Sequence, residues 1–495
     1  MRVLLSRYLG ASSLGIYQVA LSFLGVFSTV VSSGIPVSIS HVSAKCGVSK
    51  DYKKEGSYIS AGLIIGLILS LLMCISIILF KNLIIKSTNE ISYNILFIVM
   101  PSLFATAIYS CFRGALWGRE KHTANCLAEL GEQGVRLILF MILLTTASNQ
   151  TTASYLAGLS LCVSCFVSML ISIIFFKKYG GKLYNPKSEY KSLLKTSSTI
   201  TITRLVTSLV QPVVAIILPM RLISSGYSSN LAMSLFGIAL GMTFPLLALP
   251  NTICGSFAVA LVPEMSSILE KKEEDTLKEK INLSIIVTLF SCFCFIPMFL
   301  GLGKELGELL FDNTMSGYLL TISAWTMIPS GLCLISNSIL NTLNMEKQGF
   351  LTYIAGTVFL FLCIWFLPQY CGVSSVIYGM GISSCVSAIL NFMLISKKTK
   401  VKTNISKPLC LMTLFSLPCA MLGKYFHGVL KYAFPSLISI GIACFICSLC
   451  FVILCIVFNL IDIKFILKDI KFVKTLKVKT KKAKQWLFLN KISKI

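Results

Sequence analysis

The chain has 495 residues, of which 55% are hydrophobic and only 13% are charged. A soluble protein of this length needs far more charge on its surface, so the composition excludes a soluble globular enzyme. The net charge of +25 does not indicate nucleic-acid binding, because most Lys residues stand in short clusters between long apolar stretches. The sequence therefore predicts an all-α polytopic membrane protein without a nucleic-acid partner.

Thirteen apolar segments are candidate membrane spans, since a span needs about 20 apolar residues. The connections between them are short and polar, and none could hold a soluble domain. The segments lie near residues 12–41, 57–80, 91–118, 123–145, 152–176, 192–219, 230–262, 281–303, 316–343, 349–367, 373–396, 408–423 and 435–461.

The connections alternate in their content of Lys and Arg. Those predicted for one side, beginning with residues 45–55 and including the C-terminal tail, carry 33 basic residues, whereas the opposite side carries eight. Because basic residues stay on the cytoplasmic side, we predict a multi-pass protein of the cell membrane with a cytoplasmic C-terminus. The tail, residues 462–495, is either an amphipathic helix on the anionic inner leaflet or a frayed basic end.

Two short matches indicate an internal repeat. Pro36 and Pro263 stand 227 positions apart, and Glu120–Lys121 stand 226 positions before Glu346–Lys347. Both matches fall at equivalent cytoplasmic ends, which predicts a parallel repeat with a pseudo-twofold axis along the membrane normal. We expect an N-terminal lobe over 1–180, a C-terminal lobe over 181–400 and a final helix pair over 401–461. Six helices per lobe require a helix before residue 12, so residues 1–10 are predicted to end a truncated first helix.

Charged residues inside the spans are candidates for function, because a charge at the bilayer centre costs about 2.5–3.5 kcal/mol on insertion scales. Glu129, Glu132 and Arg136 recur along one face of a single predicted helix. Arg136 can reach Glu132, and Arg113 can neutralise Glu129. These charges either fix the helix to its neighbours or line a cavity that responds to substrate or to a coupling ion, and the available pairings favour the first role.

Three further arginines have no such local partner. Arg204 lacks an acidic neighbour three or four positions away, so it needs a partner on another helix or an anionic ligand. A pyrophosphate suits it, because guanidinium groups bind phosphate oxygens bidentately. Arg7 and Arg221 are predicted at the outer ends of equivalent helices, where they either attract a headgroup or extend to the interface.

No pattern indicates catalysis, a cofactor or a metal. The nineteen Cys residues are scattered through apolar segments, where Cys acts as a small packing residue. The chain has no Walker loop and no GxSxG or HExxH motif. We therefore expect neither an enzyme nor a bound metal or cofactor.

The chain resembles a known family in several segments. YLGASSLGIYQVALSF, FRGALWGREKHTANCLAELGEQGVRLIL and LPNTICGSFAVALVPEMSSILE are similar to the stage V sporulation protein B-like polysaccharide/oligosaccharide flippases of the multidrug/oligosaccharidyl-lipid/polysaccharide (MOP) exporter superfamily. The resemblance implies a fourteen-helix fold with two six-helix lobes around a central cavity. It also implies a polyprenyl-pyrophosphate-linked saccharide as substrate, including the peptidoglycan precursor of the spore cortex, with membrane lipids as partners.

Three functional hypotheses remain open. The first is a flippase that moves a lipid-linked saccharide to the outer leaflet by alternating access, with Arg204, Arg113, Glu129, Glu132 and Arg136 in its cavity. The second is a multidrug/cation antiporter of the same superfamily, which a carboxylate-lined cavity would favour. The third is a non-transporting scaffold that recruits cell-wall synthesis proteins, which an apolar interior would favour.

Overall fold

The computed structural model describes residues 2–186, 189–271, 273–400, 405–458 and 460. The predicted basic tail, 462–495, lies outside these ranges. Within them every regular element is a helix and no strand occurs, which confirms the predicted all-α polytopic class.

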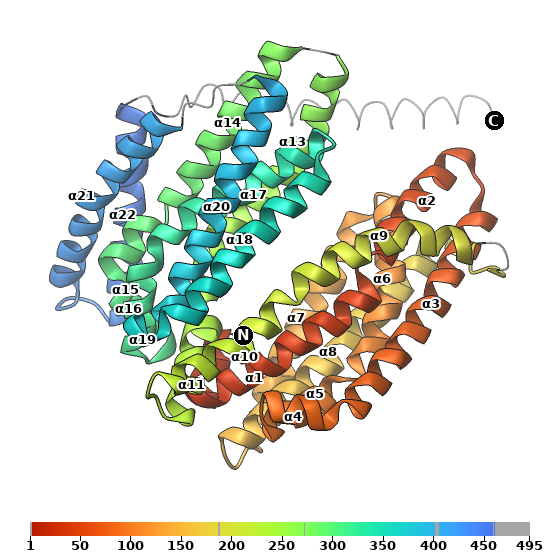
Figure 1. The fold of residues 1–495 in the computed structure, drawn as a ribbon, viewed down its shortest axis with the longest axis horizontal. Helices are drawn as coiled ribbons and strands as arrows, with labels where there is room; N and C mark the ends of the chain where they lie inside the picture. The colour runs from red at the N-terminus through yellow and green to blue at the C-terminus, as the bar shows by residue number, and fades with distance from the viewer. Residues whose placement is uncertain (1, 187–188, 272, 401–404, 459, 461–495) are drawn as a thin grey trace.

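The N-terminal lobe contains the first eight helices, and the ninth packs onto it (Figure 1). Kinks divide several of the predicted spans into two helices. The elements are α1 (Arg2–Ser32), α2 (Ile35–Ser49), α3 (Tyr52–Leu79), α4 (Lys81–Ser87), α5 (Glu90–Val99), α6 (Ser102–Gly118), α7 (His122–Leu144), α8 (Gln150–Lys178) and α9 (Tyr190–Ser208).

The C-terminal lobe follows, and a final helix pair packs against its α14 and α15. The lobe consists of α10 (Val210–Ser224), α11 (Ser229–Phe236), the π-helix η1 (Gly237–Thr243), α12 (Phe244–Leu247), α13 (Leu249–Glu270), α14 (Glu274–Phe293), α15 (Ile296–Phe311), α16 (Thr314–Ser323), the 3-10 helix η2 (Ala324–Thr326), α17 (Met327–Thr342), α18 (Glu346–Phe366), α19 (Pro368–Cys371) and α20 (Ser374–Thr399). The pair is α21 (Ser406–Leu430) and α22 (Ser436–Val457).

Twelve helical segments of the described residues are long and apolar enough to cross a membrane, and the pair α5–α6, bent by 45°, makes a thirteenth. Two predicted spans differ from these. The span at 230–262 is divided into two segments that meet at Ala248. The span at 123–145 forms α7, but its window holds Glu129, Glu132 and Arg136, so it is too polar to count.

Helices α9 and α10, separated only by Leu209, connect the lobes. Helix α9 packs against α1, α2 and α3, and the Tyr58 hydroxyl lies 3.1 Å from Thr196 Oγ1. Helix α10 packs instead against α11 and α18, as well as against α1. The predicted boundary between the lobes, at residues 180 and 181, assigns α9 to the C-terminal lobe. In the structure, α9 packs against helices of the N-terminal lobe.

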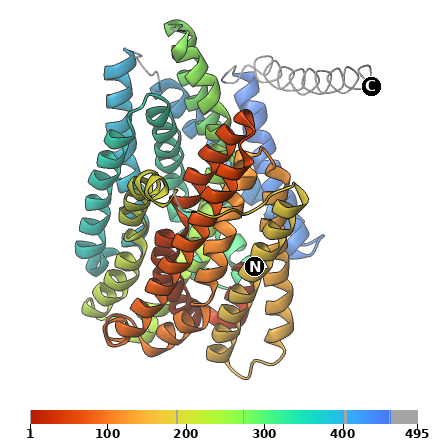
Figure 2. The same cartoon turned by 90° about the vertical axis from the view of Figure 1, so that its right-hand side faces the viewer.

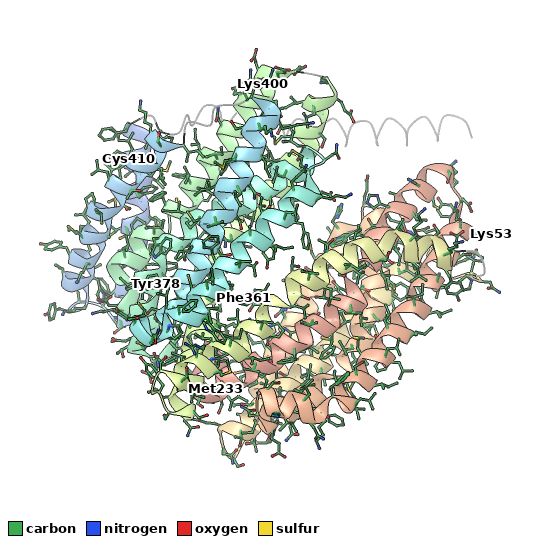
Figure 3. The ribbon with its side chains drawn as sticks, viewed as in Figure 1. Lys53, Met233, Phe361, Tyr378, Lys400 and Cys410 are labelled. Carbon is green, nitrogen blue, oxygen red and sulfur yellow. The ribbon has the colours of Figure 1, made fainter. Side chains whose placement is uncertain are left out.

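The two lobes form a V (Figure 1). They diverge toward the end that carries Lys53 and Lys400, which we call the Lys-rich end (Figure 3). The view turned by 90° shows that the long helices of both lobes run in a common direction (Figure 2). A membrane normal along that direction places the Lys-rich end at one surface and the point of the V at the other.

At the point of the V, α1 crosses η1 with the two backbones in contact. A Cβ atom added to Gly237 would overlap the carbonyl oxygen of Ala11, and one added to Gly15 would overlap that of Met233. All seven residues of η1 are buried. Glycine at both positions lets the helices approach more closely than any side chain would allow, as in other membrane helix pairs.

The structure supports the parallel repeat but changes its register. The three-residue links α6–α7 and α17–α18 each have a middle residue with a φ of 58°, Glu120 and Asn344. Helix α18 begins 224 positions after α7 (346 − 122), and α20 begins 224 positions after α8 (374 − 150). The predicted match at 226 is wrong by two, because Glu120 and Lys121 precede their helix whereas Glu346 and Lys347 begin theirs.

The glycine crossing predicts a stability effect. Gly237→Ala should lower the melting temperature of the purified protein in detergent, since overpacking costs about 1–3 kcal/mol. The matched control is Gly25→Ala, where a Cβ would meet no atom within 4 Å; that variant should melt at or above the wild-type temperature, because Ala favours a helix by up to ~1 kcal/mol. Equal melting temperatures for the two variants would contradict a tight crossing.

Candidate functional site

The first pair of predicted charges joins α6 to α7. Arg113 Nη2 lies 2.9 Å from Glu129 Oε1, and the guanidinium also stacks over the Trp117 ring at 4.2 Å. Tyr109 donates its hydroxyl hydrogen bond to the same Glu129 oxygen at 3.3 Å. The pair is accessible, because 34% of the Arg113 side chain and 49% of the Glu129 side chain are exposed.

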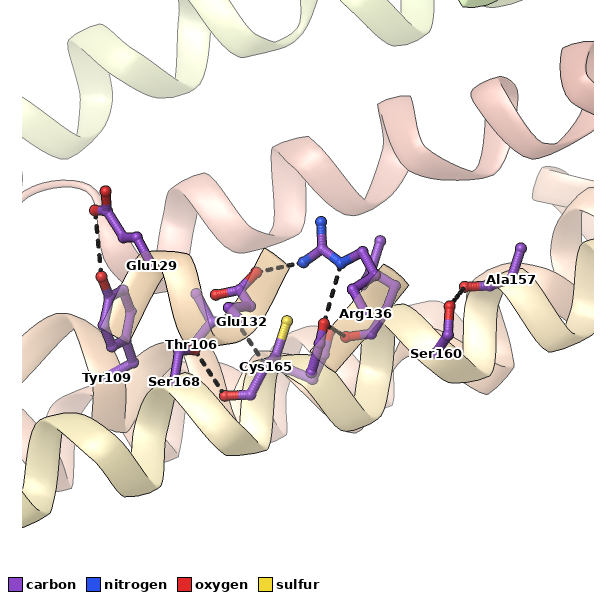
Figure 4. A network of polar contacts seen from close by, with 12 residues as sticks. Thr106, Tyr109, Glu129, Glu132, Arg136, Ala157, Ser160, Cys165 and Ser168 are labelled. Carbon is purple, nitrogen blue, oxygen red and sulfur yellow. Dashed lines mark hydrogen bonds and ion pairs between the residues drawn. The ribbon is translucent and has the colours of Figure 1, made fainter. Parts of the chain in front are cut away.

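The second pair lies deeper on α7 (Figure 4). Arg136 forms an ion pair with Glu132 one helical turn away, and its Nε donates to Ser164 Oγ on α8 at 3.0 Å. Both charged side chains are mostly buried. Figure 4 shows Glu129, Glu132 and Arg136 along α7, so the two pairings that the sequence predicted are both present.

These contacts determine the charge of a pocket in the N-terminal lobe. A pocket of about 590 Å³ is lined by Tyr109, Arg113, Glu129 and Glu132 together with neighbours on α7. Its two carboxylates and the two guanidinium groups beside them cancel, so paired charges rather than surplus cations border it. An anion entering the pocket would compete with Glu129 for Arg113, whose Nε is buried and has no hydrogen-bond partner in the described part of the chain.

Among the predicted site arginines, Arg204 is the one without a partner among the described residues. It is exposed on α9, and its side chain makes no ion pair or hydrogen bond with any residue that the structure describes. It does not line the pocket on α6 and α7. The structure therefore leaves its guanidinium free for a ligand but does not join it to the paired cluster.

Arg7 and Arg221 are both engaged at the point of the V. Arg7 Nε donates to the carbonyl oxygen of Leu310 at 3.1 Å, and its Nη2 donates to that of Leu309. Arg221 Nε donates to the carbonyl oxygen of Trp365 at 2.9 Å and lies over the same indole ring. Each arginine thus satisfies carbonyls in the last turn of a C-terminal-lobe helix, where a positive charge is favourable.

A third ion pair was missed by the sequence analysis. Arg119, just after α6, donates to both carboxylate oxygens of Glu55 on α3, at 2.7 and 2.9 Å. It also donates to the carbonyl oxygen of Tyr179 and stacks on Phe176. The Glu55 side chain is 1% exposed. Because the partners are 64 positions apart, no local spacing could have predicted this bidentate pair, which fixes the Lys-rich end of the N-terminal lobe.

Sequence comparison then assigns the family. Residues 1–269, more than half of the chain, match the family described as "Polysaccharide biosynthesis protein". The chain belongs to this family. A curated relative, stage V sporulation protein B of Bacillus subtilis (strain 168), is 23% identical over 337 residues, which are 65% of each chain. The alignment thus spans just under two thirds of that relative's length, and the predicted resemblance is confirmed.

Solved structures share the fold. The inward-facing conformation of a multidrug resistance MATE family transporter of the MOP superfamily matches with a TM-score of 0.66 at 14% identity, over 81% of this chain and 94% of that one. The lipid II flippase MurJ in an inward closed conformation matches with a TM-score of 0.64 at 16% identity, over 92% and 95%. With twelve candidate spans among the described residues, the protein is a multi-pass membrane protein of this family.

The Glu55–Arg119 pair predicts a large stability loss. Arg119→Gln should lower the free energy of unfolding by about 3–5 kcal/mol, because it leaves a buried carboxylate without its partner. The control is Lys53→Gln, two positions before Glu55 and exposed, which should change the free energy by less than ~0.5 kcal/mol. A denaturant titration of both variants provides the measurement. A loss no larger than that of the control would mean that the pair contributes nothing.

Proposed function

We propose that this protein is a transporter of the MOP type that flips a polyprenyl-pyrophosphate-linked saccharide from the cytoplasmic to the outer leaflet by alternating access. The observation that carries the proposal is the V: the lobes are in backbone contact at one end and diverge toward the Lys-rich end. Since basic residues mark the cytoplasmic surface, this conformation would face the cytoplasm, and the distribution of Lys in the sequence predicts the C-terminus on that side.

The charge distribution supports a substrate with an anionic group. Arg204 on α9 is exposed and unpaired among the described residues, and α9 stands on the wall of the V. A pyrophosphate would give it the anionic partner that the described residues do not supply. Arg113 would be a second contact if the headgroup displaced it from Glu129, to which it is bound at an accessible position.

The lipid chain can stay in the bilayer during this movement, because only the headgroup needs a polar path between the lobes. Rocking of the two lobes about the α1–η1 crossing would close the Lys-rich end and open the other. With Arg113 withdrawn, Glu129 would become a carboxylate that binds a proton or another cation. This offers a route for a coupling ion, in addition to the membrane potential.

A multidrug/cation antiporter is the second candidate. The match to a structure named as a multidrug resistance transporter favours it, as does the half-exposed carboxylate of Glu129. The two functions differ in the charge of the cargo: an antiporter of cations would depend on Glu129 and tolerate the loss of Arg204, whereas a flippase would show the opposite dependence.

The proposal is tested with the purified protein in liposomes. The measurement is movement of a fluorescent polyprenyl-pyrophosphate-linked disaccharide between leaflets, compared with protein-free vesicles. Arg204→Ala should slow this movement about tenfold, equivalent to ~1.4 kcal/mol, because the pyrophosphate loses a charge-assisted contact. Lys191→Ala, an exposed cation at the start of the same helix, should retain the wild-type rate.

Absence of protein-dependent movement of the saccharide lipid would overturn the proposed function. Movement that is equal in wild type and Arg204→Ala would remove the role assigned to that side chain. Export of an organic cation by the same liposomes, abolished by Glu129→Gln, would instead identify the antiporter.

A further inference from the structure

The repeat relates the charged pocket of the N-terminal lobe to a second pocket. With the 224-position register of α7 and α18, Glu129 corresponds to Tyr353 (353 − 129), Glu132 to Gly356 and Arg136 to Leu360. Tyr353 and Leu360 line a pocket of about 270 Å³ in the C-terminal lobe. Each lobe thus has a pocket on the corresponding helix. The pocket of the N-terminal lobe is lined by ionised groups, and that of the C-terminal lobe by neutral groups.

This second pocket has a mainly apolar lining that also carries neutral polar groups. It is bordered by α10, η1, α12, α13, η2, α17, α18 and α20, and α10 and η1 are also in contact with α1 of the N-terminal lobe. Seven of its seventeen lining residues carry a hydroxyl or an amide, and none of these described residues is ionisable as a carboxylate, ammonium or guanidinium. Two of the elements that border the pocket thus also take part in the contact between the lobes.

Several of the polar groups are available to a ligand. The side chains of Gln211, Ser383 and Ser384 make no hydrogen bond with any part of the chain that the structure describes. Asn251 accepts a hydrogen bond from Ser330 at 3.3 Å, which leaves its amide nitrogen free to donate. Donors and acceptors are thus both present, on α10, α13 and α20, around one small volume.

We propose that this pocket binds a sugar ring of the lipid-linked substrate while the pyrophosphate stays with the arginine of α9. The assignment rests on the proposed function. It adds that different parts of the protein bind the sugar and the pyrophosphate. Neutral hydroxyl and amide groups match the hydroxyls of a sugar, and Phe244 and Tyr353 offer aromatic surface to its C–H face. The volume lies near the lower limit of ~300 Å³ for small-molecule sites, so it suits one ring rather than a chain.

Other ligand classes fit this pocket less well. A phosphate would enter without a cationic partner, and an organic or metal cation would enter without a carboxylate, so each would lose its hydration at a large cost. An apolar compound would leave the free groups of Gln211 and Ser384 unpaired. A neutral ligand with many hydroxyls is the class that satisfies both the polar and the apolar parts of the lining.

The test compares two probes bound to the purified full-length protein in detergent: a polyprenyl-pyrophosphate-linked disaccharide and the same polyprenyl pyrophosphate without sugar. The variant is Gln211→Leu combined with Ser384→Ala. It should weaken binding of the disaccharide probe about tenfold, because sugar hydroxyls lose two partners, and leave binding of the sugar-free probe unchanged.

The control is Ser160→Ala, the position 224 residues before Ser384, whose buried hydroxyl is bonded to the carbonyl oxygen of Ala157. It should bind both probes as the wild type does. An equal change for the two probes, or no change for either, would overturn the sugar site while leaving flipping intact. A wild-type protein that neither binds nor moves the disaccharide probe would overturn the proposed function and the site together. Melting temperatures of all variants show whether a loss of binding comes from misfolding. Ser384→Ala alone is a conservative change, and it should show part of the same selective loss of disaccharide binding.

Discussion

The lobes meet in a contact that is made without side chains. Where α1 crosses α11 and η1, Gly15 and Gly237 bring the backbones together: a methyl group on Gly237 would overlap the carbonyl oxygen of Ala11 on α1, and one on Gly15 would overlap that of Met233 on α11. Because packing in a membrane relies on close van der Waals contact rather than on the hydrophobic effect, this crossing fixes the point of the V. From this contact the two lobes diverge toward the Lys-rich end (Figure 1).

The two lobes share the backbone arrangement of the repeat, but the side chains at corresponding positions differ in chemistry. The links before α7 and α18 have the same length and the same left-handed middle residue, yet the charged face of α7 is replaced by Tyr353, Gly356 and Leu360 on α18. For the proposed substrate, whose headgroup has ionised and neutral parts, each lobe would match a different part of the headgroup.

Much of this could be predicted from the sequence, and the limits have physical causes. Composition, apolar segments and the distribution of Lys gave the polytopic class, and a four-residue spacing on one helix gave the Glu132–Arg136 pair. The Glu55–Arg119 pair was not predictable, because it joins residues that only the fold brings together. The register of the repeat was misplaced by two because short identities such as Glu–Lys occur both in links and at helix starts. The neutral pocket could not be predicted, because no charged residue in the sequence indicates it. Its lining residues come together only in the fold, from α10, α13, α18 and α20 among other elements.

The hydrogen bonds of Arg7 have a consequence for lipid dependence. The guanidinium belongs to the N-terminal lobe, but the carbonyls that accept from it end α15 of the other lobe, and the contact is exposed. If the lobes rock as proposed, opening the point of the V would break it. Phosphates of anionic phospholipids at that surface would then compete for the freed arginine and favour the open form. The proposed rocking would in that way depend on the headgroup composition of the leaflet at the point of the V.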